Sequence, residues 1–248
     1  METSLYQRKC LRNSAGRPLV SRVLRFLVLC LVAGSPAVVH ADTYGPGLEL
    51  GVRTGYAFSA GHVGRVGNGN DSDLGDFISA QVPLWLDVGY RLNSNLYLGA
   101  YFQYGVGVVN DDRQTVCRNG NVDCSASDLR LGVMGRYALG ALGQATPWVG
   151  LGFGYEWTRF SIHQSVLGST NTDATSSGFE IANLQFGLDF PLTSRFLIAP
   201  FLSVSLGQYQ SRSTKTVAGA LTTNLDEDYD DKSLHEWVLI GARFAFAP

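Results

Sequence analysis

The sequence predicts an all-β protein, an eight-stranded antiparallel up-and-down transmembrane β-barrel. Apolar residues take every second position in eight segments, most clearly in 82–92 and 96–108, and a period of two is the pattern of β-strands. These two segments match or exceed the roughly 9–11 residues with which a tilted strand crosses a bilayer. Long and short connections alternate along the chain, which is typical of outer-membrane barrels with brief periplasmic turns and extended extracellular loops.

The N-terminal 41 residues have the composition of a cleaved signal peptide. A basic region that ends at Arg25 precedes a short apolar run, Phe26 to Ala33, and Val39-His40-Ala41 supplies a cleavage site. The apolar run is far shorter than the roughly 18 residues of a spanning helix, so it predicts export and not anchoring. We therefore expect residues 1–41 to be removed and residues 42–248 to form one barrel domain.

Charge and cysteine content describe the exported segment. Residues 42–248 keep 13 basic and 20 acidic residues, a net charge of −7 with His neutral. Nucleic acid is therefore not an expected partner, because phosphate binding needs a basic surface. Cys117 and Cys124 are the two cysteines of this segment, and in an exported chain they predict a disulfide within one polar loop.

The alternating residues define the elements in chain order. The predicted strands are 48–58, 82–92, 96–108, 129–139, 147–157, 182–190, 196–206 and 238–246. Long loops are predicted at 60–76, 109–127, 160–177 and 208–233, and short turns at 93–95, 140–146 and 191–195. Pro200 cannot donate a ladder hydrogen bond, so it marks a weak point or a bulge in the seventh strand.

The distribution of aromatic residues decides which face is outside. A soluble lipocalin-type barrel would turn its apolar face inward, but here the polar face is rich in Gly and poor in charge for a surface in water. The apolar face carries one aromatic band near the short turns and another near the long loops, as two membrane interfaces select. These residues are Tyr90, Tyr137, Phe190, Phe196, Phe244 and Phe246 in the first band, and Phe58, Tyr104, Tyr155 and Trp157 in the second.

The closing segment Gly241 to Phe246 ends on an aromatic residue followed only by Ala247 and Pro248. With this segment and its strand pattern, the chain resembles the OmpA/OmpX-type small outer-membrane β-barrel family over residues 47–246. The resemblance implies residence in the outer membrane of a Gram-negative bacterium, contact with its lipid and lipopolysaccharide, and a monomer. It also implies insertion by the barrel-assembly machinery through Gly241 to Phe246.

Charged residues on the inward face are predicted to form an ion-pair network, because eight strands enclose just enough room for side chains. Unpaired charges there would be very costly, so we expect Arg130 to meet Glu156, Glu49 to meet Arg243, and Arg53 to meet Asp87. A gated pore or proton path is the alternative to such a salt-bridged plug, and we expect a barrel that does not conduct. The inward charged residues are Glu49, Arg53, Asp87, Arg91, Arg130, Arg136, Glu156, Asp189 and Arg243.

Catalytic signals are weak. His163-Gln164-Ser165 is similar to the His-x-Ser element of the lipid A deacylases of the PagL type, which are also eight-stranded barrels. If the fifth strand continued past Trp157, His163 and Ser165 would share the lipid-facing side, and Glu180 would match them as the acid. The alternative is a polar loop histidine. His62 and His235, like His163, are expected near the extracellular side.

The acidic run Asp226 to Asp231 is a weak candidate for binding a hard cation. Asp226, Asp228 and Asp230 offer carboxylate oxygens, which could hold Ca²⁺ or bridge to lipopolysaccharide, but the run lacks the pattern of an EF-hand. A solvated surface run is the alternative, and no cofactor is expected.

These observations predict an integral outer-membrane barrel that is not an enzyme. Its expected role is envelope architecture or surface interaction through four long extracellular loops, since function concentrates on loops of rigid scaffolds. Transport of a small apolar molecule through a lateral opening, as in OmpW-like barrels, is the second hypothesis, and lipid A deacylation is the third.

Overall fold

A computed structural model describes residues 45–247 except 66–72, 111–116, 118–120, 141–144 and 166–168. The predicted signal peptide and its cleavage site lie outside the described residues. The strands are β1 (Gly47–Gly61), β2 (Ile78–Arg91), β3 (Leu96–Val109), β4 (Val122–Ala138), β5 (Thr146–Gln164), β6 (Thr170–Pro191), β7 (Phe196–Ala218), β8 (Leu221–Asp228) and β9 (Leu234–Phe246). A single short helix in this part of the chain, α2 (Leu74–Phe77), lies between β1 and β2. Among the described residues, no helix is long and apolar enough to cross a membrane.

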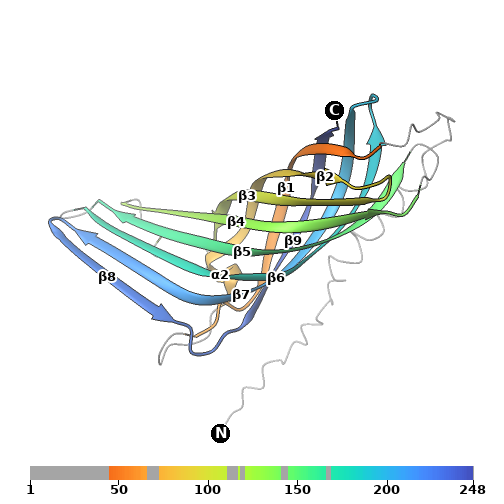
Figure 1. Ribbon diagram of the computed structural model, residues 1–248. Coiled ribbons are helices and arrows are strands. Elements are labelled where there is room, and N and C mark those ends of the chain that lie inside the picture. The colour runs from red at the N-terminus through yellow and green to blue at the C-terminus, as the bar shows by residue number, and fades with distance from the viewer. Residues whose placement is uncertain are drawn as a thin grey trace, which may run out of the picture. The chain divides into compact units, whose positions relative to one another are not determined.

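The strands close into a ring, as the sequence predicts. Each of β1 to β6 pairs antiparallel with its successor, β7 pairs with β9, and β9 pairs with β1. Eight described strands therefore form the barrel, and β8 pairs only with β7, outside the ring (Figure 1). The turns that join β2 to β3 and β6 to β7 lie at the end of the barrel where β1 begins and β9 ends. This end is periplasmic, because outer-membrane barrels have short turns on the periplasmic side and longer loops outside.

The apolar residues of the barrel face outward. Leu84, Val106 and Val133 are among the many exposed large hydrophobic side chains, whereas Glu49, Arg53 and other charged residues are buried inside. This arrangement is the reverse of a soluble lipocalin-type barrel. The prediction of a transmembrane β-barrel is confirmed.

Two of the four predicted long loops are strands, which corrects the sequence prediction. β5 and β6 continue through most of 160–177, and β7 and β8 form a hairpin through most of 208–233, with Gly219 at φ 58° in its turn. Ser and Thr in these segments suggested loops because of their polarity. β-branched Thr, however, fits a strand, and ladder hydrogen bonds satisfy the backbone above the membrane as well as within it. We call the parts of β4 to β8 that lie beyond the predicted barrel strands, on the side opposite the periplasmic turns, the extracellular extension.

A β-bulge in β6 changes which side chains enter the lumen. The register of β6 shifts between Glu180 and Ala182 against β7, and between Glu180 and Asn183 against β5. Ile181 and Ala182 both face outward, so Glu180, 1% exposed, turns into the lumen. A second shift, next to Gln210, places Tyr209 inward and Ser211 outward. Continuous alternation through β6 would have put Glu180 on the lipid side.

Pro200 interrupts pairing on one side of β7 only. It pairs in register with Ala242 of β9, but the ladder between β6 and β7 lapses between Gly187↔Phe201 and Phe190↔Ile198. A proline without an amide proton explains a local gap of this kind. The sequence prediction of a weak point in this strand therefore agrees with the structure.

Candidate functional site

The periplasmic half of the lumen holds what we call the periplasmic cluster: Glu49, Arg53, Asp87, Arg91, Arg136, Asp189 and Arg243. One carboxylate, Glu49, pairs with three arginines, Arg91, Arg136 and Arg243. Arg53 Nε lies 2.8 Å from Asp87 Oδ1, and Arg243 Nη2 lies 3.2 Å from Asp87 Oδ2. The sequence-predicted pairs Arg53 with Asp87 and Glu49 with Arg243 are therefore both in contact.

Glycine makes room for these long side chains. A Cβ at Gly51 would lie 2.6 Å from Asp87 Cγ, so only glycine lets Asp87 reach Arg53. Asp189, at the periplasmic rim, lies 3.9 Å from Arg243 Nη1 and accepts a 2.8 Å hydrogen bond from Trp148 Nε1.

Aromatic rings line the middle of the lumen and stack on arginines. Arg53 Cζ lies 4.6 Å from the ring centroid of Trp85, and Arg136 Cζ lies 4.2 Å from that of Tyr97. A guanidinium over an aromatic face is stabilised by the ring quadrupole, more so when it is desolvated. The rings of Trp85 and Tyr101 are 5.0 Å apart, and they belong to one buried cluster with Tyr97 and Met134.

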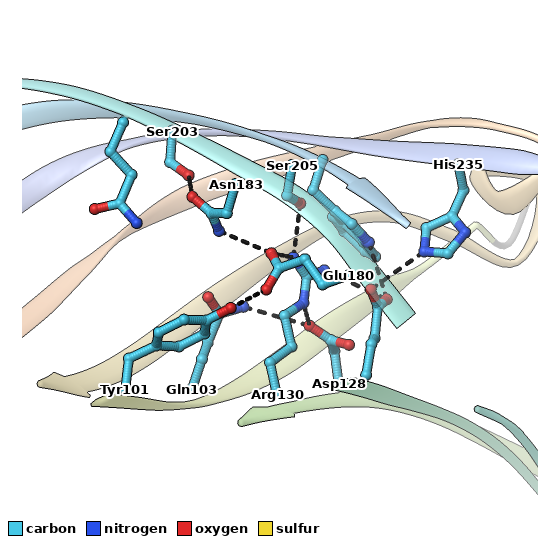
Figure 2. Close-up of polar contacts among 12 residues, drawn as sticks. Tyr101, Gln103, Asp128, Arg130, Glu180, Asn183, Ser203, Ser205 and His235 are labelled. Carbon is cyan, nitrogen blue, oxygen red and sulfur yellow. Dashed lines mark hydrogen bonds and ion pairs between the residues drawn. The ribbon is translucent and has the colours of Figure 1, made fainter. Parts of the chain in front are cut away.

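The upper half of the lumen holds the extracellular cluster: Asp128, Arg130, Glu156, Glu180 and His235. Arg130 is its centre, as Figure 2 shows, with Nε 2.8 Å from Asp128 Oδ2 and Nη1 3.2 Å from Glu180 Oε1. Arg130 Nη2 lies 3.4 Å from Glu156 Oε1, which is the third predicted pair. His235 Nε2 lies 3.2 Å from Glu156 Oε2.

Neutral donors complete the shell around these three carboxylates. Donors from several strands of the ring converge on them, so the network ties distant parts of the chain together. Tyr101 and Asn183 (2.7 Å) donate to Glu180, and Gln81 (3.2 Å) and Gln103 (3.3 Å) donate to Asp128. Tyr209 (3.0 Å) and Trp237 (3.2 Å) donate to Glu156.

The two clusters have opposite charge balance. The periplasmic cluster joins four arginines to three carboxylates. The extracellular cluster joins three carboxylates to one arginine and one histidine. Together they place ion pairs at both levels of the lumen, most of them between buried side chains.

Sequence reasoning missed the lumen positions of Asp128, Glu180 and His235. Asp128 has the inward parity of Arg130 but precedes the predicted start of its strand, so a longer strand would have revealed it. Glu180 is hidden by the bulge at Ile181. His235 was expected near the extracellular side and is there, but it is buried and stacked 4.0 Å from the ring of Tyr209.

The residues of the deacylase hypothesis are not brought together. His163 Nδ1 contacts Asn171 Oδ1, and Ser165 Oγ lies 3.3 Å from Asn121 O at the far end of the extension. Glu180, expected on the same outward side, is in the lumen with Arg130 and Tyr101, which corrects that expectation. The physical reason is the bulge, which reverses the side to which Glu180 points.

The other predicted sites lie in the extension. Cys117 and Cys124 form a disulfide with their Cα atoms 5.7 Å apart. Asp226 and Asp228 share the outward face of β8, while Asp230 follows the strand. Within the described ranges, no group of three or more His, Cys, Asp or Glu residues could hold a metal ion.

The family of the chain follows from a comparison with known proteins. A family model for the autotransporter β-domain matches residues 85–245, more than half of the chain. The chain belongs to the autotransporter β-domain family. The matched part of this β-domain runs from β2 to β9 and includes the whole extracellular cluster, whereas Glu49 and Arg53 of β1 precede it. A search of curated protein sequences finds no match.

Several solved structures are similar to this chain, and the first of them supports the same fold. A major outer membrane protein from Thermus thermophilus is similar with TM-score 0.56 and 10% identity, over 81% of this chain and 98% of that chain. OprG from Pseudomonas aeruginosa (TM-score 0.41, 14% identity, 84% and 100% covered) is also similar. So is Ail, the attachment invasion locus protein of Yersinia pestis (TM-score 0.37, 16% identity, 81% and 99% covered). The chain is an integral β-barrel of the Gram-negative outer membrane.

Proposed function

We propose that this barrel is a sealed, non-catalytic component of the outer membrane that presents its extracellular extension for surface interactions. The observation that carries the proposal is the filling of the lumen by two ion-pair clusters. Arg53 and Arg130 are almost fully buried and are held by carboxylates from neighbouring strands. An ion that crossed the barrel would have to break pairs at both levels, and breaking a buried pair costs about 3–5 kcal/mol.

Conductance tests the seal directly. The purified protein, inserted into planar lipid bilayers at high salt, should give no steady unitary conductance. A change in gel mobility when the same sample is boiled shows that the inserted protein was folded. Steady steps of porin size from such a sample would overturn the proposal.

The absence of enzymatic activity is part of this proposal. His163 and Ser165 have their contacts within the extension, and Glu180 serves Arg130, so no acid orients the histidine toward the serine among the described residues. Expression in a Gram-negative host should leave the acyl-chain pattern of lipid A unchanged in mass spectra. Loss of one acyl chain that His163→Ala abolishes would overturn this part.

A second candidate function is supported by one cavity. A pocket of about 70 Å³ lies above the extracellular cluster, lined in part by Val63, Leu74, Phe77 and Phe160, with Thr158 and Tyr209 at its polar side. The apolar side of this pocket suits the apolar solute of the transport hypothesis, but its volume is well below the roughly 300–1,000 Å³ of most ligand pockets, so the pocket would have to widen for such a solute to pass. Faster entry of a small aromatic hydrocarbon into cells that express the protein would support transport over the sealed barrel.

Insertion by the barrel-assembly machinery is proposed to use the end of β9. Phe246 pairs with both Leu50 and Phe196, and its ring lies 5.0 Å from that of Phe196, so this segment completes the ring. Phe246→Ser should therefore slow the appearance of the heat-modifiable form in cells, while Ala247→Ser should not. We also propose that residues 1–41 are removed on export and that the barrel is a monomer.

A further inference from the structure

Five buried N–H and O–H groups in the periplasmic half of the lumen have no hydrogen-bond partner among the described residues. They are Trp85 Nε1, Tyr97 Oη, Arg136 Nε, Arg243 Nε and Arg243 Nη1, and we call them the orphaned donors. The four residues are at most 5% exposed, so bulk solvent does not reach them freely. A buried donor without an acceptor is costly, and more so when it carries charge. This half of the lumen therefore has donors to spare and lacks an acceptor.

The nearby carboxylates are already engaged. Glu49 Oε1 pairs with both Arg136 and Arg243, and Glu49 Oε2 pairs with a third guanidinium. Asp87 Oδ2 lies 3.2 Å from Arg243 Nη2, and Asp87 Oδ1 is paired with another arginine. Arg243 Nη1 lies 3.9 Å from Asp189 Oδ1, which is too long for a hydrogen bond. The orphaned donors of Arg136 and Arg243 thus have no carboxylate of their own.

Aromatic stacking does not replace the missing acceptor. Arg136 Cζ lies 4.2 Å from the ring centroid of Tyr97 and 5.3 Å from that of Trp148, so ring faces attract its charge. The N–H groups of a guanidinium, however, point outward in its own plane, and they form their hydrogen bonds there. The periplasmic cluster also joins four arginines to three carboxylates, which leaves one positive charge to balance.

We propose that the periplasmic half of the lumen binds one small monovalent anion, of the size and charge of chloride, beside Arg136, Arg243 and Tyr97. The two arginines converge on the same oxygen of Glu49, and the ring of Tyr97 stacks on Arg136, so the three side chains share one neighbourhood. An anion there accepts hydrogen bonds from the orphaned donors and balances the surplus charge. The extracellular cluster, with three carboxylates around one arginine, would repel it.

Packing restricts this site to a small ion. A Cβ at Gly89 would lie 2.6 Å from Tyr97 Cζ, and one at Gly187 would lie 2.6 Å from Trp148 Cε2, so aromatic rings already take the space that glycine leaves in the wall. Access is from the periplasmic rim, where the side chain of Asp189 is 16% exposed. The site therefore goes beyond the surface role of the extension, since it is reached from the other side of the membrane.

Chloride-dependent stability tests the site. The folded full-length protein in a neutral detergent is unfolded with urea in sodium chloride and in sodium gluconate of equal ionic strength, so that a difference reports the ion and not screening. A ligand that binds only the folded state shifts folding by mass action, so the folding equilibrium constant should rise by up to about tenfold for each tenfold rise in chloride. In gluconate, which is too large for the site, the constant should stay unchanged.

Variants of the donors give matched comparisons. Arg243→Met and Arg136→Met should each abolish the chloride dependence, because each removes the surplus charge and an orphaned donor. Glu49 keeps two arginines in either variant, so both should fold. Tyr97→Phe removes one hydroxyl and should weaken chloride binding by about threefold to tenfold. Arg159→Met makes the same change in the extension, where Arg159 pairs with an acid on the outward face, and should keep the full dependence.

Two results would overturn the proposal. Equal stability of the wild-type protein in both salts would assign the orphaned donors to water. Full chloride dependence in Arg243→Met and Tyr97→Phe would place the ion elsewhere. Conductance separates these failures from failure of the proposed function: a sealed barrel whose stability ignores chloride contradicts only the anion site, whereas a conducting barrel contradicts the sealed role whatever it binds.

Discussion

At the periplasmic end of the lumen one carboxylate serves three arginines, whereas at the extracellular end one arginine serves three carboxylates. The surplus at each end is stabilised differently. Extra guanidinium groups lie over Trp85 and Tyr97, because aromatic faces attract cations. Extra carboxylates instead receive hydrogen bonds from neutral side chains such as Asn183 and Trp237. Net charge within a barrel can therefore differ from zero locally if the surrounding neutral groups have the matching polarity.

Deleting Ile181 should have the largest effect, because it disrupts the extracellular cluster. Without the bulge, Glu180 would turn toward lipid and Phe179 toward the lumen, because a one-residue slip reverses the side of every residue up to the next irregularity. Arg130 would lose one of its three carboxylates, and we expect no heat-modifiable barrel on refolding into detergent. Ile181→Val, which keeps the bulge, should refold like the wild type. A folded deletion variant would show that the bulge is dispensable.

Arg130→Met should destabilise far more than Arg243→Met. Removing Arg130 leaves three buried carboxylates with His235 as their one other basic neighbour among the described residues, so the free energy of unfolding should fall by about 3–5 kcal/mol. Removing Arg243 leaves three arginines for three carboxylates, so its loss should be limited to about 1–2 kcal/mol from hydrogen bonds. Urea unfolding followed by gel mobility measures both. Equal losses would argue against a difference in charge balance.

Neutralising one carboxylate should have unequal effects at the two ends. Glu49→Gln removes the shared partner of three arginines and should cost about 3 kcal/mol in the free energy of unfolding. Glu180→Gln relieves the surplus of acid around Arg130 and keeps an acceptor for Tyr101, so it should change stability by less than about 1 kcal/mol. The same urea assay applies. A larger loss for Glu180→Gln would reverse the assignment of surplus charge.

The solvent-exposed ion pair of the extension should have the smallest effect on stability, and it provides a reference for the buried clusters. In the extension, Arg159 Nη2 lies 2.6 Å from Asp173 Oδ2, and this hydrogen bond, with one from Ser161, holds the pKa of Asp173 below its usual value. A lowered pKa in the folded state stabilises above the unfolded pKa, and that stability is lost as pH falls through the folded value. Amide exchange in the hairpin of β5 and β6 should therefore rise slightly on acidification below the usual Asp range. Asp173→Asn should remove this step, and an unchanged step would assign it to another group.

Local pattern was sufficient to predict much of this fold. Alternation identified the eight barrel strands, the outward apolar face and the enclosed charges, because the side to which a strand residue points depends only on its parity. Register counted from a short turn also placed Arg130 opposite Glu156. These features need no knowledge of distant parts of the chain.

Tertiary structure alone decided the upper lumen and the extension. A bulge leaves the composition and the period on either side unchanged, so Ile181 gives no local signal that Glu180 turns inward. The physical reason for the inward turn of Glu180 lies elsewhere in the chain, because its carboxylate pairs with Arg130 of β4 and accepts a hydrogen bond from Tyr101 of β3. Likewise, the Ser- and Thr-rich segments become strands because β5 to β8 pair with one another above the membrane. Parity is a local property, whereas the satisfaction of buried charge and backbone depends on which strands meet when the ring closes.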